Sequence, residues 1–440
     1  MISKISELIR VDKVVFSNVI WLVFEKVLKM IVSIYIFSLL ARYLGPSDFG
    51  FLNYGIAFVF IITIFIDLGL SGLVVKDLVQ KHNDNSVIIG TTFYLKMIAS
   101  IIGFTLLIIY VLFLDTIEIK IVLIFVGISI LLKPFEVIDL YNQANLKSKL
   151  SVMSKNIALI LISLIQIFFV FFKYPLYYFA FAQSLEVLFS SVLLFILYKR
   201  DGNYKKWTYC TKTAKNLLSR SWPLILSGVA SVLYLKVDQI MVESMRGEAE
   251  LGIYSVAVRI SEAWYFIAIA VVTSLFPQLI RMRERTFEYR KKLQAVYNLL
   301  FLIAFFLSIV LSLISSKLIS VLFGEEYMPA VSILIIHIWA SLFVFMRALL
   351  SKWLIIEELL MFSIVSHGFG LVINIAANII LIPKYGGEGA AIATVLAYFT
   401  STYLFTFFSK KTYDSGIMMT KSFFAPVLLI VQIYRSIRRM

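Results

Sequence analysis

Twelve apolar segments, each about long enough to cross a ~30 Å hydrocarbon core as a helix, constrain the fold of this chain most strongly. In the first half they fall near 15–41, 51–73, 88–113, 120–138, 156–172 and 176–198. In the second half they fall near 221–243, 252–280, 295–316, 331–356, 361–382 and 389–409. The composition, 61% hydrophobic and 15% charged, is also far from that of a soluble domain. The sequence therefore predicts an all-α integral membrane protein with twelve transmembrane helices.

The distribution of basic residues predicts the orientation of these helices. With a cytoplasmic N-terminus, the loops on that side hold about 27 lysines and arginines and the opposite loops hold about six. This asymmetry accounts for the net charge of +15 better than nucleic-acid binding does, because the basic residues lie between the spans. Both termini are expected in the cytoplasm. The apolar stretch 423–433 is about half a span long and is interpreted as interfacial.

Two similar loops follow the first and the seventh span, on the same side of the membrane. Residues 45–50 (GPSDFG) and 247–252 (GEAELG) both read Gly-x-x-acid-apolar-Gly. Their matched positions predict two parallel six-helix repeats related by a pseudo-twofold axis along the membrane normal. The glycines are expected to serve tight turns that need a positive φ. The predicted parts are an N-terminal six-helix bundle (1–199), a cytoplasmic linker (200–219), a C-terminal six-helix bundle (220–412) and a basic cytoplasmic or interfacial tail (413–440).

Charged side chains inside the spans are the candidate functional residues, because a charge at the bilayer centre costs about 2.5 to 3.5 kcal/mol on insertion scales. We expect four cations to line a water-accessible cavity and bind substrate: Lys26, Lys29, Lys236 and Arg259. We expect three acids to orient them, with Glu25 near Lys29 and Asp238 near Arg259: Glu25, Asp238 and Glu262. A base-rich cavity favours an anionic ligand such as a diphosphate and disfavours cationic drugs.

Other charged and polar residues are expected to have structural roles. Four charged side chains near span ends are interpreted as ion pairs or as side chains that reach the interface: Asp67, Lys133, Glu136 and Lys352. The three histidines, His82, His337 and His367, are too far apart in sequence to predict a metal site. His367 is a candidate for carrying a coupling proton, although a lone histidine is more often a hydrogen-bonded packing residue.

The chain has no sequence motif for enzyme chemistry. It lacks a phosphate-binding loop, a Gly-x-Ser-x-Gly elbow and a His-Glu-x-x-His motif, so neither an enzymatic activity nor a cofactor is expected. A transporter of this kind would draw its energy from an H⁺ or Na⁺ gradient, from the membrane potential or from the substrate gradient.

Several segments resemble those of a known family. Residues 41–50, 67–70, 234–239, 251–257 and 382–394 are similar to recurrent segments of Wzx-type O-antigen flippases. These proteins belong to the superfamily of multidrug, oligosaccharidyl-lipid and polysaccharide exporters. The resemblance covers most of the chain, and it is more specific for the superfamily than for the substrate.

The resemblance implies a V-shaped pair of six-helix bundles with a central cavity, in a bacterial inner membrane. It further implies a flippase for lipopolysaccharide biosynthesis that moves an undecaprenyl-diphosphate-linked oligosaccharide, the O-antigen repeat unit, by alternating access. The implied partners are this lipid-linked oligosaccharide, membrane lipids, and a polysaccharide polymerase with its chain-length proteins. A multidrug cation antiporter of the same superfamily and a non-transporting scaffold in polysaccharide assembly remain alternatives. Lipid-linked peptidoglycan precursor flippases resemble the chain less, because they look two helices longer.

Overall fold

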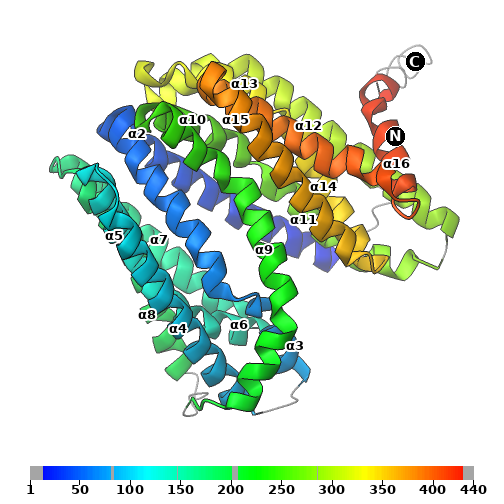
Figure 1. Cartoon of the computed structure of the whole chain (residues 1–440). Coiled ribbons are helices and arrows are strands. Elements are labelled where there is room, and N and C mark those ends of the chain that lie inside the picture. Colours follow the sequence, from blue (N-terminus) through cyan, green and yellow to red (C-terminus); the bar gives the residue numbers. More distant parts are fainter. Residues whose placement is uncertain (1–12, 81–83, 146, 201–206, 285, 430–440) are drawn as a thin grey trace. The chain divides into compact units, whose positions relative to one another are not determined.

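A computed structural model describes residues 13–80, 84–145, 147–200, 207–284 and 286–429, and every regular element in these ranges is a helix (Figure 1). Nine helical segments in the described ranges are long and apolar enough to cross a membrane. They are Lys29–Asp67, Asn85–Leu112, Ile117–Ala144, Lys149–Phe171, Leu176–Arg200, Glu248–Phe276, Phe287–Phe323, Ala330–Ile356 and Met361–Phe408. The multi-pass membrane protein predicted from the sequence is therefore confirmed, whereas the count of twelve helices stays a prediction.

Two of the long helices are interrupted by a glycine. Helix α2 (Lys13–Asp67) breaks at Gly45, with φ 72° and ψ 172°, directly before Pro46. Helix α15 (Leu360–Tyr398) breaks at Gly386, with φ 56° and ψ −134°. Only glycine adopts such angles at little cost, and proline cannot donate the hydrogen bond that would continue a helix. Each of these elements therefore consists of two helices that meet at a sharp turn.

The chain divides into two compact units that differ from the predicted halves. One unit takes residues 36–252, and the other combines the described residues up to Tyr35 with those from Ile253 onward. The boundaries fall inside the first predicted span and at the start of the eighth, and neither lies in the predicted linker 200–219. The division into two six-helix domains thus stays a prediction.

In the unit 36–252, four long helices pack side by side. Helix α5 (Ile117–Leu132) packs against α4 (Asn85–Leu112) and α8 (Leu176–Arg200), and α8 also packs against α7 (Ser148–Phe171) (Figure 1). The other elements of this unit are α3 (Leu70–Gln80), η1 (Lys133–Glu136), α6 (Val137–Ala144), α9 (Thr211–Arg246) and the first residues of α10 (Glu248–Glu262). A buried cluster centred on Leu70, Val74, Ile138 and Leu194 holds α3 and α6 against α4 and α8.

The second unit is built around one large apolar core. Helices α11 (Tyr265–Met282), α12 (Thr286–Phe323) and α14 (Ala340–Ile356) pack on one another. Buried residues such as Leu279, Leu300 and Leu349 fill the space between them. The remaining elements are η2 (Glu325–Tyr327), α13 (Ala330–His337), the π-helical turn η3 (Phe399–Tyr403), η4 (Leu404–Phe408) and α16 (Tyr413–Phe423).

Three segments differ from the sequence expectations. The second span, predicted to reach residue 73, ends at Asp67, because Leu68 and Gly69 have positive φ angles of 52° and 62° that break the helix. The expected linker is helical from Thr211 onward. Residues 413–423, assigned to the tail, form α16, whose Met419 is fully buried against α12. The stretch 423–433 extends beyond the described residues, so its interfacial placement stays a prediction.

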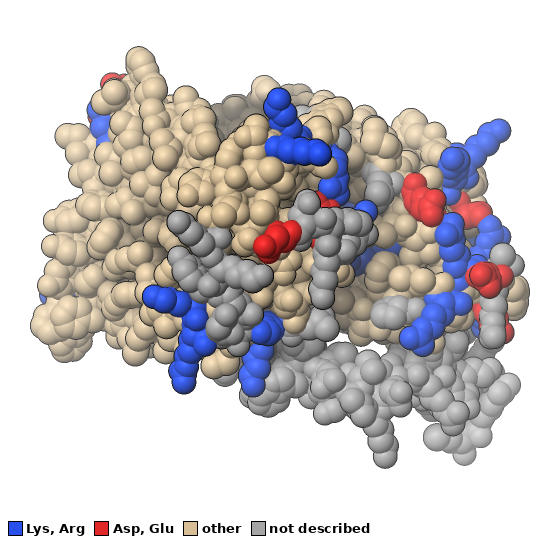
Figure 2. All heavy atoms as spheres, turned by 90° about the horizontal axis from the view of Figure 1, so that it is seen from below, with Lys and Arg blue, Asp and Glu red and all other residues tan. Residues whose placement is uncertain are grey.

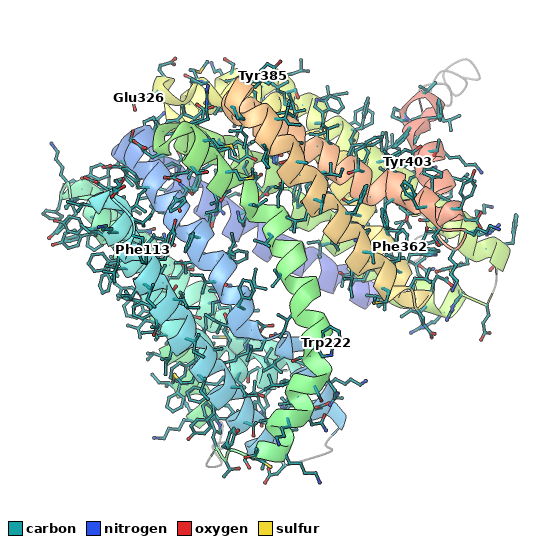
Figure 3. The ribbon with its side chains drawn as sticks, in the orientation of Figure 1. Phe113, Trp222, Glu326, Phe362, Tyr385 and Tyr403 are labelled. Carbon is teal, nitrogen blue, oxygen red and sulfur yellow. The ribbon has the colours of Figure 1, made fainter. Side chains whose placement is uncertain are left out.

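Large apolar side chains cover much of the outer surface. Phe113, Trp222 and Tyr385 are 81%, 57% and 55% exposed, and they project from the ends or sides of their helices (Figure 3). An exposed aromatic ring in water is unfavourable, whereas lipid acyl chains and the membrane interface accommodate it. The surface is therefore that of a protein surrounded by lipid.

Candidate functional site

The first group of predicted substrate-binding residues lies on α2. Lys26 and Lys29 are both exposed, and they form no salt bridge within the described part of the chain. Glu25 lies in the same helix, but its side chain is outside the described residues. The two lysines are three residues apart and so share a face of the helix. The orienting role of Glu25 stays a prediction.

The second group of predicted residues lies on α9 and α10. Asp238 is buried and Lys236 is half-buried on α9, whereas Arg259 is exposed and Glu262 is half-buried on α10. Lys236 and Asp238 belong to the unit 36–252, and Arg259 and Glu262 belong to the other unit. Asp238 and Arg259 thus belong to different units, and their pairing stays a prediction.

His367, the candidate for proton coupling, is half-buried on α15 next to a buried arginine network. Arg347 on α14 donates hydrogen bonds to the hydroxyl of Ser366 (2.9 Å) and to the carbonyl oxygen of Ser401 (3.2 Å). It is also bonded to Ser363. Hydroxyl and carbonyl groups therefore solvate this cation inside the helix bundle, and its bond to Ser401 ties α14 to the π-helical turn η3.

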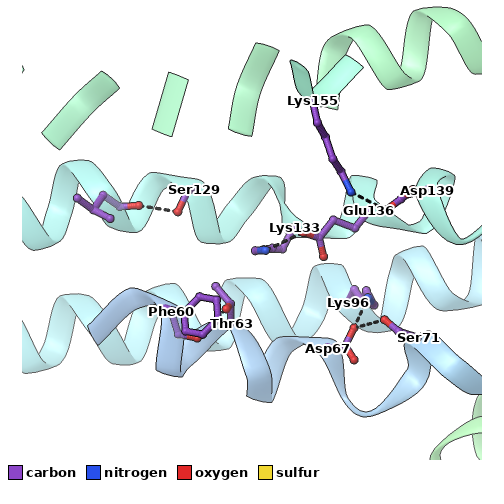
Figure 4. Close-up of polar contacts among 11 residues, drawn as sticks. Phe60, Thr63, Asp67, Ser71, Lys96, Ser129, Lys133, Glu136, Asp139 and Lys155 are labelled. Atoms are coloured by element: carbon purple, nitrogen blue, oxygen red, sulfur yellow. Dashed lines mark hydrogen bonds and ion pairs between the residues drawn. The ribbon is translucent and has the colours of Figure 1, made fainter. Parts of the chain in front are cut away.

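The described residues also form a polar groove that the sequence did not reveal as a unit. Ser71, which lines this groove, contacts an ion pair between the Lys96 Nζ and the Asp67 carboxylate, which are 2.7 Å apart (Figure 4). The side chain of Lys96 is 1% exposed and that of Asp67 is 34% exposed. The hydroxyl of Ser71 donates a second hydrogen bond to Asp67. Because Leu68 and Gly69 turn the chain here, Ser71 on α3 returns to face the end of α2.

The groove itself is lined by residues of α3, η1, α6, α7 and α8. Lys133 pairs with Glu136 at 2.6 Å, and Lys155 pairs with Asp139 at 2.7 Å (Figure 4). Glu136 lines two neighbouring cavities of about 380 and 170 Å³. The polar side chains of the larger cavity are Ser71, Glu136, Asp139 and Gln143, and those of the smaller are Lys133, Glu136, Lys155, Glu186, Ser190 and Ser191. We call these cavities and their polar residues the charged groove.

The chemistry of the charged groove suits a polar ligand rich in hydroxyl groups. Its carboxylates accept hydrogen bonds, its lysines donate them, and Ser71 and Gln143 do both. The larger cavity falls within the range of about 300 to 1,000 Å³ that is usual for small-ligand sites. The sequence contained one signal for the ion pair next to this groove: Asp67 and Lys96 stand at comparable distances from the predicted cytoplasmic ends of spans two and three. The turn at Leu68 could not be predicted from the sequence, because leucine is not a residue type that indicates a positive φ.

The two Gly-x-x-acid-apolar-Gly loops, each of which is helical after its first glycine, contact each other within the unit 36–252. A Cβ placed on Gly50 would lie 1.9 Å from the carbonyl oxygen of Glu248, and one placed on Gly252 would lie 2.1 Å from that of Pro46. The last glycine of each loop therefore packs on the second residue of the other loop. The contact is thus reciprocal, because it joins equivalent positions of the two loops.

The glycines of these loops serve two different purposes. Gly45 and Gly247, the first glycines, have φ angles of 72° and 87°, so the predicted turns with positive φ are confirmed there. Gly50 and Gly252 are not among the positive-φ residues, so the expectation of such turns is wrong for them. They are glycines because a side chain would collide with the backbone of the opposite loop.

Proteins named for O-antigen transport and for capsular polysaccharide biosynthesis are similar to this chain. It is 25% identical over 398 residues to a Shigella flexneri protein named "Putative O-antigen transporter", covering 86% of this chain and 94% of that one. It is 25% identical over 415 residues to the capsular polysaccharide biosynthesis protein CapF of Staphylococcus aureus, covering 90% of this chain and all of that one. Both alignments extend over almost the whole of each relative.

Among solved structures, the lipid II flippase MurJ in its inward closed conformation has a similar fold. It superposes with a TM-score of 0.75 and 17% sequence identity, and the match covers 95% of this chain and 93% of MurJ. At this identity the likeness concerns the fold alone. The profile of the family described as "Polysaccharide biosynthesis protein" matches residues 15–283, which is more than half of the chain. The chain therefore belongs to the polysaccharide biosynthesis protein family.

Proposed function

We propose that this protein is a flippase that moves an undecaprenyl-diphosphate-linked oligosaccharide, an O-antigen repeat unit, from the cytoplasmic to the periplasmic face of a bacterial inner membrane. The observation that carries the proposal is the match to the polysaccharide biosynthesis family over residues 15–283. It is supported by the relative named as an O-antigen transporter, which the chain matches over 94% of that relative's length. Alternating access between two repeats is the proposed mechanism.

A twelve-helix topology follows if each interrupted apolar segment crosses twice. The segments Lys29–Asp67 and Met361–Phe408 have 39 and 48 residues, and each contains a glycine break. A 39-residue helix would be about 58 Å long, roughly twice the hydrocarbon core. Two crossings for each of these, with one for the 36-residue α9, bring the nine candidate segments to twelve. The reciprocal contact between the two loops supports the same pair of repeats.

In this proposal the substrate is bound in parts. Lys26, Lys29, Lys236 and Arg259 bind the diphosphate, and Glu25, Asp238 and Glu262 orient them. The charged groove offers hydrogen bonds to sugar hydroxyls on the cytoplasmic side. The prenyl chain stays in lipid, because moving it into a wet cavity would cost about 0.8 kcal/mol for each CH₂ group. An H⁺ or Na⁺ gradient drives the cycle, with His367 as the candidate proton carrier, and a polysaccharide polymerase with its chain-length proteins receives the product.

Substitution of the predicted diphosphate-binding cations tests this proposal directly. In a strain that lacks the gene, we expect Lys26→Ala and Arg259→Ala at matched protein levels to leave lipid-linked sugar units on the cytoplasmic face. Each lost charge-assisted contact is worth about 1.5 to 3 kcal/mol, which corresponds to a loss of roughly ten- to 150-fold in substrate affinity. The measurement is the fraction of lipid-linked sugar accessible from each side of membrane vesicles.

The control for this experiment is Lys76→Ala, which removes an exposed lysine on α3. It should restore export like the wild type. Full export by both test variants would contradict the assignment of the diphosphate site. If deletion of the whole gene left the distribution of lipid-linked sugar unchanged, the flippase function itself would be rejected. A drug antiporter predicts this unchanged distribution. A scaffold instead predicts that the variants lower protein abundance.

The single cysteine provides a test of the orientation. Cys210 precedes α9, and a hydrogen bond from the backbone N–H of Thr213, with further bonds from the Thr213 side chain and the Lys212 backbone, lowers the pKa of its thiol. A lowered pKa increases the thiolate fraction at neutral pH. We therefore expect a membrane-impermeant maleimide to label Cys210 in inside-out vesicles but not in intact cells. Labelling of intact cells would place this segment, and with it the termini, on the opposite side.

A further inference from the structure

A second polar cavity lies at one end of the unit that contains α11 to α16. It has a volume of about 310 Å³ and forms where α11 ends, α12 begins, α14 ends and α16 begins. Figure 2 shows acidic and basic side chains gathered at the right-hand end of the molecule, where α12 begins in Figure 1. We call this cavity the terminal pocket, and the predicted orientation places it on the cytoplasmic side. Its lining residues are Arg283, Tyr289, Arg290, Leu293, Trp353, Glu357, Lys411, Asp414, Ser415 and Met418.

The rim of the terminal pocket has an excess of positive charge. Glu357 accepts hydrogen bonds from the Tyr289 hydroxyl (3.2 Å) and from Arg283 (3.5 Å). Asp414 forms an ion pair with Arg290. Each of the two carboxylates is thus paired with one arginine. Lys411 is exposed, and its amino group has no bonding partner within the described residues. One cation of the rim is therefore available to an anion from outside the protein.

The floor of the terminal pocket is apolar, and apolar side chains also stand outside it. Leu293 and Trp353 form the floor and are 2% and 8% exposed. On helices α11, α12 and α16, which meet at the pocket, Ile280, Phe287 and Tyr413 are 50%, 80% and 49% exposed. Exposed aliphatic and aromatic groups next to arginine and lysine are typical of the depth where acyl chains meet head groups. A ligand of this pocket should therefore carry a phosphate together with apolar groups.

We propose that the terminal pocket binds the head group of an anionic phospholipid from the cytoplasmic leaflet. Basic pockets between transmembrane helices on the cytoplasmic side bind such head groups in other membrane proteins. The lipid phosphate would lie between Lys411 and Arg283, with its glycerol and first methylene groups against Trp353. Free phosphate shares the charge but lacks the apolar part, so the exposed Phe287 and Ile280 favour the lipid. This site is separate from the one proposed for the transported substrate.

Lipid binding to the purified full-length protein in neutral detergent tests this proposal. The measured quantity is the apparent affinity, from native mass spectrometry and from the rise in melting temperature. We expect phosphatidylglycerol to bind and stabilise the protein, and phosphatidylcholine and inorganic phosphate to do neither. Lys411→Ala and Arg283→Ala should each weaken phosphatidylglycerol binding about fivefold, because each removes one cation near the surface. Added salt should weaken the binding as well.

Two further variants distinguish a specific site from general attraction. Lys291→Ala removes an exposed lysine of α12 that does not line the pocket, and it should leave the affinity unchanged. Glu357→Gln removes the acid that holds Arg283, and it should strengthen binding. Because Lys411 is exposed, its substitution should not alter the melting temperature without lipid. Equal losses in Lys411→Ala and Lys291→Ala, or equal stabilisation by phosphatidylcholine or by phosphate, would overturn the proposal.

Discussion

Gly50→Ala and Gly252→Ala are each expected to separate the two Gly-x-x-acid-apolar-Gly loops and to lower both stability and transport. The added methyl group of Gly50→Ala would lie 1.9 Å from the carbonyl oxygen of Glu248, and that of Gly252→Ala would lie 2.1 Å from the carbonyl oxygen of Pro46. These atoms belong to the backbone, so no side chain can rotate away to make room. Overpacking usually costs about 1 to 3 kcal/mol, and contact with a backbone carbonyl places both variants at the upper end. Thermal unfolding in detergent and export of lipid-linked sugar are the measurements.

A glycine in open space gives the matched control for these variants. A Cβ added to Gly72 on α3 would have no neighbouring heavy atom within 4 Å, and the helix should gain about 0.5 to 1 kcal/mol from alanine. Gly72→Ala should therefore keep or raise the melting temperature. If Gly50→Ala and Gly252→Ala unfolded at the wild-type temperature and supported full export, the close contact of the loops would be wrong.

These two loops show how far a sequence pattern predicts this fold. The repeated pattern correctly indicated turns at Gly45 and Gly247, because positive φ is a local property of the chain. The contact of Gly50 with Glu248 depends on segments about 200 residues apart, and a single sequence carries no signal for such a contact. The apolar segments could also be predicted, because their length and composition are likewise local properties of the chain. Lipid imposes a length and a composition on each segment separately.

The candidate site was predicted less completely than the fold. Asp67 was expected to form an ion pair or to reach the interface, but only the structure shows that its partner is Lys96. Lys133 and Glu136 were expected either to form ion pairs or to reach the interface, and the structure has them paired at 2.6 Å, because residues three apart on a helical turn are neighbours. The proposed role of Lys26, Lys29, Lys236 and Arg259 stays a prediction, because it depends on how segments far apart in the sequence are arranged around a ligand. No local property of the sequence determines that arrangement.

Asp67→Asn is expected to destabilise the protein more than Lys96→Met, although both break the same ion pair. Asp67→Asn leaves the ammonium group of Lys96, whose side chain is 1% exposed, without a counter-charge. Breaking a buried pair in this way costs about 3 to 5 kcal/mol. Lys96→Met leaves the Asp67 carboxylate, whose side chain is 34% exposed and accepts a hydrogen bond from Ser71, so water and the hydroxyl solvate it. We expect a loss of about 1 to 2 kcal/mol for that variant.

The double variant Asp67→Asn/Lys96→Met separates pairing from other effects of either change. It removes both charges and places an unbranched apolar chain in the space of the lysine, so it should be more stable than Asp67→Asn alone. Lys133→Met provides a matched control, because Lys133 and Glu136 are 25% and 42% exposed and such pairs contribute about 0 to 1 kcal/mol. Unfolding free energies in mixed micelles measure all four variants. Equal losses for Asp67→Asn and Lys133→Met would show that water reaches the Lys96 ammonium group, and they would contradict the burial of this ion pair.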